Sequence, residues 1–393
     1  MTLRINPALE AALASPIMTA GSWLQGVDFP ADRPLINLAQ AAPSEPPPLR
    51  LREAMAKALL TQTDAHLYGA VLGRDDLRAE VARQWSEAYE AEIAPDDVSV
   101  TTGCNQAFCA AISSLAGAGD EVILPTPWYF NHKMWLDMIG ATAVPLPTGE
   151  DCLPDPAAAE ALVTERTRAI ALVTPNNPTG AEYPAALLSA FDDLCARRGL
   201  TLIVDETYRD FDSRSGPPHT LFAREGWRDR FIHLYSFSKA YRLTGHRVGA
   251  VITSPARLFQ MEKFIDTVTI CPNQIGQIGA LEGLKTLSQF VAGERAELIA
   301  RRDALKAAFD EGMNGWRICG AGAYFAYLEH PFDMGSEALA QQLVRDQSLL
   351  LLPGTFFAPP GDAQAERTVR VAYANVGIDG IREAMARLKA FAP

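Results

Sequence analysis

Short runs of β-branched and aliphatic residues alternate with helical stretches between about residue 98 and residue 252. Runs of this length, bounded by turn-forming residues, predict buried strands. The candidate strands are residues 98–101, 121–124, 169–174, 201–205, 232–236 and 249–252, and helices are predicted between them, including residues 106–116 and 185–198. This alternation predicts an α/β fold of three layers, in which a mostly parallel sheet has helices on both faces.

The pattern changes on either side of this region. Residues 42–48 hold four prolines, which excludes regular helix and central strand, so we interpret them as the crossing from an N-terminal arm into the main domain. Residues 289–309 predict a long amphipathic helix that leads into a C-terminal region of α+β character. We predict a large domain over residues 45–285 and a smaller α+β domain formed by both chain ends, residues 1–44 and 286–393.

Composition narrows the classes of partner. The chain of 393 residues carries 35 basic and 47 acidic side chains, a net charge of −12, which argues against nonspecific binding to nucleic acid or an anionic membrane. No apolar run approaches membrane-spanning length, and residues 1–25 do not have the pattern of a signal peptide. The six cysteines form no C-x-x-C pair or zinc-site spacing, so we expect reduced thiols, a cytoplasmic location and no metal site.

Polar residues follow several of the predicted strands, where ligands of open α/β sheets bind. Gly103-Cys104-Asn105 opens a helix, and its free backbone N–H groups can face an anion. The turn at 175–180 is rigid enough to aim Asn177 at a ligand. Asp205 ends a buried strand, where its carboxylate needs either a cationic partner or backbone N–H groups.

The segment 236–247 carries the strongest chemical signal. Ser236 precedes Lys239 by three residues, and Arg247 follows eight residues later. A lysine amine can form a Schiff base with an aldehyde, while a serine hydroxyl and a guanidinium can hold a phosphate. The neighbouring His246 is expected to be a surface or packing residue.

Taken in order, these segments resemble the fold-type I, pyridoxal-phosphate-dependent aminotransferases of class I/II, from about Leu35 to Val376. The resemblance implies that Lys239 holds pyridoxal 5'-phosphate as a Schiff base and later moves the substrate proton. It implies that Asp205 pairs with the pyridine nitrogen and that Asn177 and Tyr208 bond the phenolic oxygen. The phosphate ligands that it implies are Gly103, Cys104, Asn105, Ser236 and Arg247.

The same resemblance extends to three more positions. It implies that Tyr129, with Trp128 as the alternative, stacks on the cofactor ring. It implies that Tyr68 reaches the phosphate of a neighbouring subunit, hence a homodimer, and that Arg370 grips the substrate α-carboxylate beside Asn177. The chain departs from the family at Cys104, where small or hydroxyl residues are common, and at Ala42, where a glycine usually precedes the proline.

We therefore predict a cytoplasmic, homodimeric aminotransferase that moves an amino group from an L-amino acid to a 2-oxo acid by a ping-pong mechanism. One alternative keeps the cofactor and performs β-elimination as a carbon–sulfur lyase. A second alternative is a binding or regulatory protein on the same fold. Five aromatic residues further suggest an apolar or aromatic side-chain pocket: Trp23, Tyr129, Tyr324, Phe356 and Phe357.

Overall fold

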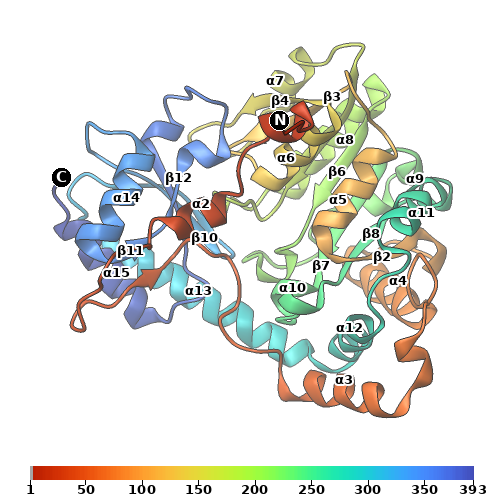
Figure 1. Cartoon of the computed structure of the whole chain (residues 1–393). Coiled ribbons are helices and arrows are strands. Elements are labelled where there is room, and N and C mark those ends of the chain that lie inside the picture. Colours follow the sequence, from red (N-terminus) through yellow and green to blue (C-terminus); the bar gives the residue numbers. More distant parts are fainter. Residues whose placement is uncertain (1–2) are drawn as a thin grey trace.

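A seven-stranded sheet forms the centre of the computed structural model, which describes residues 3–393, so Met1 and Thr2 of the predicted small domain lie outside it. Its strand order is β2-β8-β7-β6-β5-β3-β4 (Figure 1). All neighbours pair in parallel except β8, which runs antiparallel to both β2 and β7. The strands are β2 (Val98–Thr101), β3 (Glu121–Thr126), β4 (Thr142–Pro147), β5 (Thr167–Val173), β6 (Thr201–Asp205), β7 (Phe231–Ser236) and β8 (Gly249–Ile252).

Successive side chains of a buried strand point to opposite faces of the sheet, and both faces are covered here. On β6, Leu202 and Val204 pack into one apolar cluster, whereas Ile203 packs into another. The first cluster includes side chains of α4 (Asp75–Tyr89) and α8 (Ala185–Arg198), and the second includes those of α5 (Gly103–Ser113), α6 (Phe130–Ile139) and α11 (Pro255–Thr269). The predicted three-layer α/β fold is confirmed.

A second, smaller sheet lies in the C-terminal part of the chain. Its antiparallel order is β12-β13-β10-β9, with β9 (Arg317–Gly322), β10 (Phe325–Glu329), β12 (Leu352–Pro353) and β13 (Thr368–Ala372). The helices of this part are α13 (Ser288–Asp310), α14 (Ser336–Gln347) and α15 (Ile378–Ala390). Figure 1 shows α13 running from the central sheet region to this smaller part.

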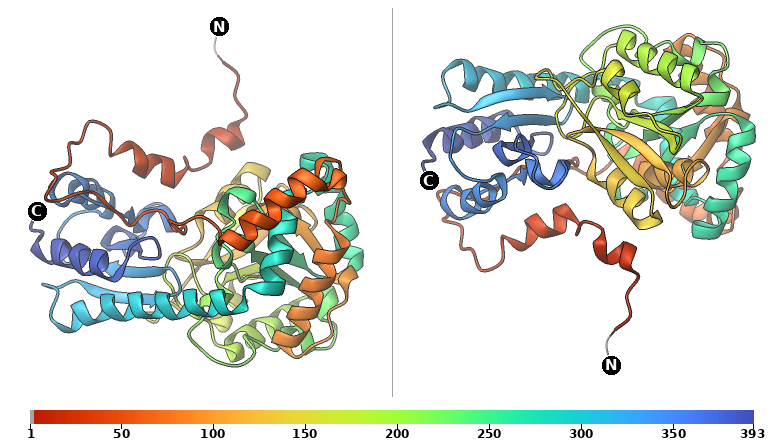
Figure 2. Two further views of the ribbon diagram at one scale, coloured as in Figure 1. Left: turned by 90° about the horizontal axis from the view of Figure 1, so that it is seen from below. Right: turned by 90° about the horizontal axis from the view of Figure 1, so that it is seen from above.

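The N-terminal segment joins the C-terminal part through strand pairing. β1 (Ile36–Asn37) pairs in parallel with β11 (Leu349–Leu350), and α2 (Pro16–Ser22) contacts β12. Ahead of them, the chain passes through α1 (Pro7–Ala11), and its first described residues project away from the body in both views of Figure 2. Both chain ends therefore contribute to the smaller part, while the boundaries at residues 45 and 285 stay a prediction.

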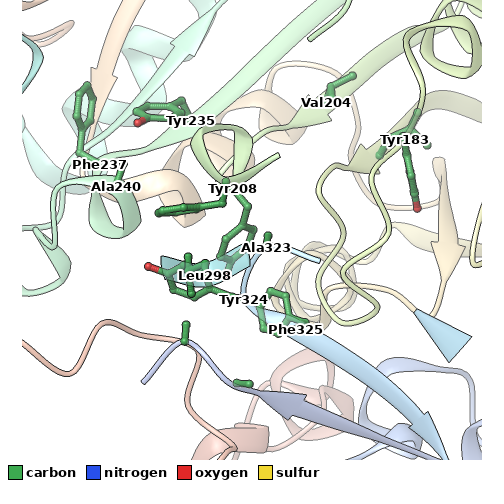
Figure 3. Close-up of a cluster of buried hydrophobic side chains, with 14 of the residues drawn as sticks. Tyr183, Val204, Tyr208, Tyr235, Phe237, Ala240, Leu298, Ala323, Tyr324 and Phe325 are labelled. Carbon is green, nitrogen blue, oxygen red and sulfur yellow. The ribbon is translucent and has the colours of Figure 1, made fainter. Parts of the chain in front are cut away.

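Two helices, α3 (Leu49–Thr61) and α12 (Gln274–Thr286), pack against each other at the end of the molecule away from the smaller C-terminal part (Figures 1 and 2). Among the described residues, none of the helices is both long enough and apolar enough to cross a bilayer. The aromatic cluster of Figure 3 joins the two parts, since Tyr208 of the larger one lies against Tyr324 and Phe325 of the smaller, with ring centroids 5.2 Å and 5.1 Å apart.

Most predicted elements match the structure closely, and two differ. α5 begins at Gly103 rather than at residue 106, so Cys104 and Asn105 belong to its first turn. The sequence pattern missed β4, because Pro145 and Pro147 interrupt it. Proline is tolerated there because β4 is an edge strand that pairs with β3 alone.

Candidate active site

A cavity of about 310 Å³ opens at the carboxyl ends of the parallel strands. Val173, Asp205 and Ser236, the last residues of β5, β6 and β7, line its floor. Arg370 enters from β13 of the smaller sheet, and the N-terminal segment adds Ala41. The cavity therefore lies between the two sheets, as expected for an open α/β sheet whose strand ends point to one edge.

The structure brings most of the predicted site residues together around this cavity. Those that line the cavity are Cys104, Asn105, Tyr129, Asn177, Asp205, Tyr208, Ser236, Lys239, Arg247 and Arg370. Gly103 lies just behind it with a φ of +79°, and a Cβ atom there would collide with the Arg247 guanidinium. Tyr68 is 80% exposed and does not line the cavity, and of the two aromatic candidates Tyr129 does so whereas Trp128 does not.

Asp205 keeps its negative charge although it is buried. Its Oδ2 lies 3.2 Å from Nε2 of His132, and the backbone N–H of Thr207 donates to Oδ1 at 3.0 Å. Burial alone would raise the pKa of Asp205, but the hydrogen bond and charge of His132, together with Thr207, outweigh it and lower the pKa. The His132 ring stacks on Phe108 at 3.7 Å, which fixes its orientation.

His132 is a site residue that the sequence reasoning missed. It lies in the first turn of α6, three residues after Tyr129, and its ring packs edge-on against that tyrosine at 5.0 Å. The available signal was its place one helical turn after the aromatic loop. Its partner Asp205 lies 73 positions away, and no short motif links them.

Lys239 has an amine poised to lose its proton near neutral pH. Burial, then the nearby charges of Arg247 and Arg370, lower its pKa from 10.5 to about 8. Its Nζ donates a hydrogen bond of 2.6 Å to the carbonyl of Ala41 and lies 5.7 Å from the ring centroid of Tyr208. A neutral amine is the form that attacks an aldehyde.

The part of the cavity around Arg247 suits an anion. Arg247 adopts a left-handed backbone conformation, and its Nη1 donates to Ser238 Oγ at 3.3 Å and to the Thr244 carbonyl at 3.1 Å. The N-terminus of α5 begins beside it at Gly103, because no side chain separates the two. A guanidinium, serine hydroxyls and helical N–H groups are donors that could hold a phosphate.

Arg370 is only 1% exposed and has no carboxylate partner among residues 3–393. Its Nη1 donates to Asn177 Oδ1 at 3.1 Å, its Nη2 donates to the Ala39 carbonyl, and its Nε has no partner. Burial lowers its pKa to about 10, so the guanidinium stays charged at neutral pH. A buried, unpaired guanidinium is costly unless an anionic ligand joins it.

The aromatic residues expected to form a side-chain pocket are arranged differently from the prediction. Only Tyr129 lines the cavity. Trp23 packs on Phe356 with centroids 6.0 Å apart, and Phe357 lies behind the wall against Phe130 at 5.5 Å. Tyr324 packs on Tyr208 in the apolar junction between the two sheets and does not face the cavity (Figure 3).

Comparison with known proteins shows the family of the chain. The family "Aminotransferase class I and II" matches residues 33–388 of the chain. The valine–pyruvate aminotransferase of Mycobacterium tuberculosis is 29% identical with 100% of each chain covered, and the aspartate aminotransferase of Thermotoga maritima is 28% identical with 91% of each covered. A single mutant of Thermus thermophilus aspartate aminotransferase superposes with a TM-score of 0.88 at 25% identity over 99% of each chain.

The chain belongs to the aminotransferase class I and II family. It is an aminotransferase, as the recognised resemblance predicted, and the lyase alternative is not favoured. Members of this class use pyridoxal phosphate.

The lowered pKa of Lys239 gives a direct prediction for the cofactor-free protein. Labelling of Lys239 by an amine-specific acylating reagent should rise with pH around a midpoint of about 8, because only the neutral amine reacts. Arg370→Leu removes one neighbouring positive charge, so the midpoint should move upward, toward 10.5. Peptide mass spectrometry after competitive labelling measures both values. A midpoint near 10.5 in the unsubstituted protein would contradict the electrostatic arrangement described above.

Proposed function

We propose that this aminotransferase holds pyridoxal 5'-phosphate in the cavity through Lys239 and transfers an amino group from an L-amino acid to a 2-oxo acid by a ping-pong mechanism. The observation that carries the proposal is the convergence of Lys239, Asp205 and Arg370 on one cavity from three separate elements. When bound, the cofactor supplies an aldehyde and an electron-withdrawing ring that stabilises negative charge at the substrate α-carbon.

The residues that line the cavity fit the chemical groups of that cofactor. Arg247, Ser236 and the N-terminus of α5 provide the donors that a phosphate requires. Asp205 remains ionised and would pair with a protonated ring nitrogen, and its ties to His132 and Thr207 hold it in place. Lys239 lines the same cavity and would supply the amine for the aldehyde.

Asn177 and Tyr208 would hold the phenolic oxygen. Because Asn177 Oδ1 accepts from Arg370, its Nδ2 is left as the donor for a ligand. Burial first, then the charge of Tyr129, raises the pKa of Tyr208 well above its ordinary value, so its hydroxyl keeps the proton and can donate. Tyr129, whose hydroxyl donates to Asn105 at 3.2 Å, is our choice for the ring-stacking aromatic residue.

Arg370 would bind the substrate α-carboxylate with two parallel hydrogen bonds, replacing its present bond to the Ala39 carbonyl. This would fix the α-carbon beside Lys239. The neutral amine of Lys239 can take the proton from the α-carbon in the first half-reaction and return a proton to it in the second. Asn177 would assist Arg370 in orienting the carboxylate, since the two side chains are already bonded.

Replacement of Lys239 tests this function. Lys239→Arg keeps the positive charge but removes the amine, so transfer from amino acids to 2-oxo acids should fall by at least about a thousandfold. Lys306→Arg, an exposed lysine on α13, is the matched control and should retain full activity. The assay measures 2-oxo acid release from a panel of L-amino acids with pyruvate or 2-oxoglutarate. Release of pyruvate and ammonia from a sulfur amino acid without any acceptor would instead establish the lyase.

We also propose that the active enzyme is a homodimer and that Tyr68 reaches the neighbouring cavity. Tyr68 and Leu67 are 80% and 61% exposed, and they lie beside the segment of Ile270, because Gly69 N–H contacts Cys271 Sγ at 3.4 Å. An apolar surface of this kind is unfavourable in water unless another chain covers it. The family resemblance supports a second copy of the chain as the partner that covers it. The six free cysteines fit our expectation of a reducing, cytoplasmic location.

The dimer has a simple hydrodynamic test. Light scattering after size exclusion should give twice the 42.6 kDa mass of the chain. The double substitution Leu67→Asp and Ile270→Asp should shift the protein toward the monomer, because charges would be buried at the interface. The exposed Leu9→Asp is the control and should leave the mass unchanged. A monomeric mass for the unsubstituted, cofactor-loaded protein would contradict the proposed dimer.

A further inference from the structure

The turn that carries Asp205 and Tyr208 also carries two charged side chains that the proposed function does not use. Asp205 and Tyr208 are three positions apart and both line the cavity. Glu206 and Arg209, also three positions apart, do not line it. Glu206 is only 2% exposed, and a buried carboxylate costs free energy unless it is hydrogen-bonded and paired. Whatever stabilises Glu206 therefore also helps to fix the turn.

The carboxylate of Glu206 is held by three side chains. Its Oε2 accepts a hydrogen bond from the hydroxyl of Tyr89 and lies 2.8 Å from Nε2 of His233. Nε2 of His219 lies 3.3 Å from the same oxygen. Burial alone would raise the pKa of Glu206, but the two histidines outweigh it and lower the pKa well below its usual range. Glu206 is therefore ionised at neutral pH and fixed in position.

The helix that contacts Glu206 also holds Arg209. Trp85 and Tyr89 both belong to α4 and are four positions apart, so they lie on one face of it. The guanidinium carbon of Arg209 lies 4.1 Å from the ring centroid of Trp85 and 5.0 Å from that of Tyr89, within the range of a cation–π interaction. Tyr89 thus contacts Glu206 through its hydroxyl and Arg209 through its ring.

These contacts anchor the turn at both ends. The backbone N–H of Arg209 donates to the carbonyl of Glu206 at 3.1 Å, which closes the turn. Tyr208 lies inside it, and its own carbonyl accepts from the N–H of Phe211 at 2.9 Å. Asp205 directly precedes the turn. A backbone fixed in this way leaves Tyr208 little freedom to move relative to Asp205.

From these contacts we propose, resting on the proposed function, that Glu206 is a positioning residue. By anchoring the turn, it sets the hydroxyl of Tyr208 at the separation from Asp205 that one cofactor ring requires, since Tyr208 would bond the phenolic oxygen and Asp205 the ring nitrogen. Glu206 itself does not line the cavity. Its replacement would therefore act through the residues of the turn that do.

The absorbance of the cofactor-loaded protein, titrated against pH, tests this role. Tyr208→Phe should raise the pKa of the bound cofactor, because a hydrogen bond to the phenolic oxygen favours its deprotonated form. Glu206→Gln replaces a carboxylate by an amide whose N–H groups face other donors, so the turn should loosen. It should raise the same pKa by at least about 0.5 unit more in the otherwise unsubstituted protein than in Tyr208→Phe.

The comparison of the two backgrounds separates positioning from charge. Loss of the negative charge of Glu206 acts equally with and without the hydroxyl of Tyr208, so this part cancels. An equal shift in both backgrounds would overturn the inference. If Glu206→Gln does not fold, Tyr89→Phe removes one donor and keeps the ring against Arg209. It should show a smaller coupling to Tyr208 of the same sign, and no coupling would again overturn the inference.

Glu121→Gln is the matched control. Glu121 is 4% exposed at the start of β3, and its carboxylate accepts from Thr164 at 2.6 Å and from Arg166 at 2.8 Å. Its substitution should lower the Tm, as Glu206→Gln does, because both remove a buried and hydrogen-bonded carboxylate. It should leave the pKa of the bound cofactor unchanged. A shift as large as that of Glu206→Gln would show a general loss of packing and contradict the positioning role.

Hydrogen exchange of the cofactor-free protein gives a readout that does not depend on the cofactor. Amide exchange in peptides that span residues 205–211 should be at least about fivefold faster in Glu206→Gln than in the unsubstituted protein, and unchanged in Glu121→Gln. Unchanged exchange in Glu206→Gln would overturn the inference and leave the proposed function intact. Failure of the unsubstituted protein to bind the cofactor at Lys239 would overturn the proposed function, whereas exchange would still decide whether Glu206 anchors the turn.

Discussion

Three cationic side chains line one small cavity that holds a single ionised carboxylate among the described residues. This excess of positive charge determines which ligands the site can hold. Burial, and after it the charges of Arg247 and Arg370, lower the pKa of Lys239 to about 8. Burying such charges costs stability unless ligands compensate for them. A phosphate and a carboxylate are the anions that would compensate for the excess positive charge. The electrostatics of the cavity therefore explain why its proposed ligands are anionic.

The fold meets this constraint by drawing the charges from different elements. Asp205 and Lys239 follow neighbouring parallel strands, so they arrive at the same edge of the central sheet. Arg370 comes from the smaller sheet and reaches the cavity because Tyr208 packs against Tyr324 across the junction (Figure 3). The site is complete only when the two sheets are packed together, which links the apolar core of the junction directly to substrate binding.

Much of this could be predicted from the sequence because the signals are local. A buried strand that ends in Asp205, or a lysine that follows Ser236, is visible within a few residues. Contacts between distant segments carried no such signal. His132 supports Asp205, and the Ala39 and Ala41 carbonyls accept from Arg370 and Lys239, across separations that only the folded chain defines. The sequence prediction for the aromatic pocket was wrong for the same reason. Packing between distant segments decides which ring faces the cavity.

The central claim is that the amine of Lys239 carries the cofactor, and covalent trapping tests it most directly. The purified protein would be incubated with pyridoxal 5'-phosphate, reduced with borohydride and digested, and the modified peptide would be located by mass spectrometry. The account predicts a single reduced adduct at Lys239, and its loss in Lys239→Arg. Absence of an adduct, or stoichiometric trapping at another lysine, would contradict it.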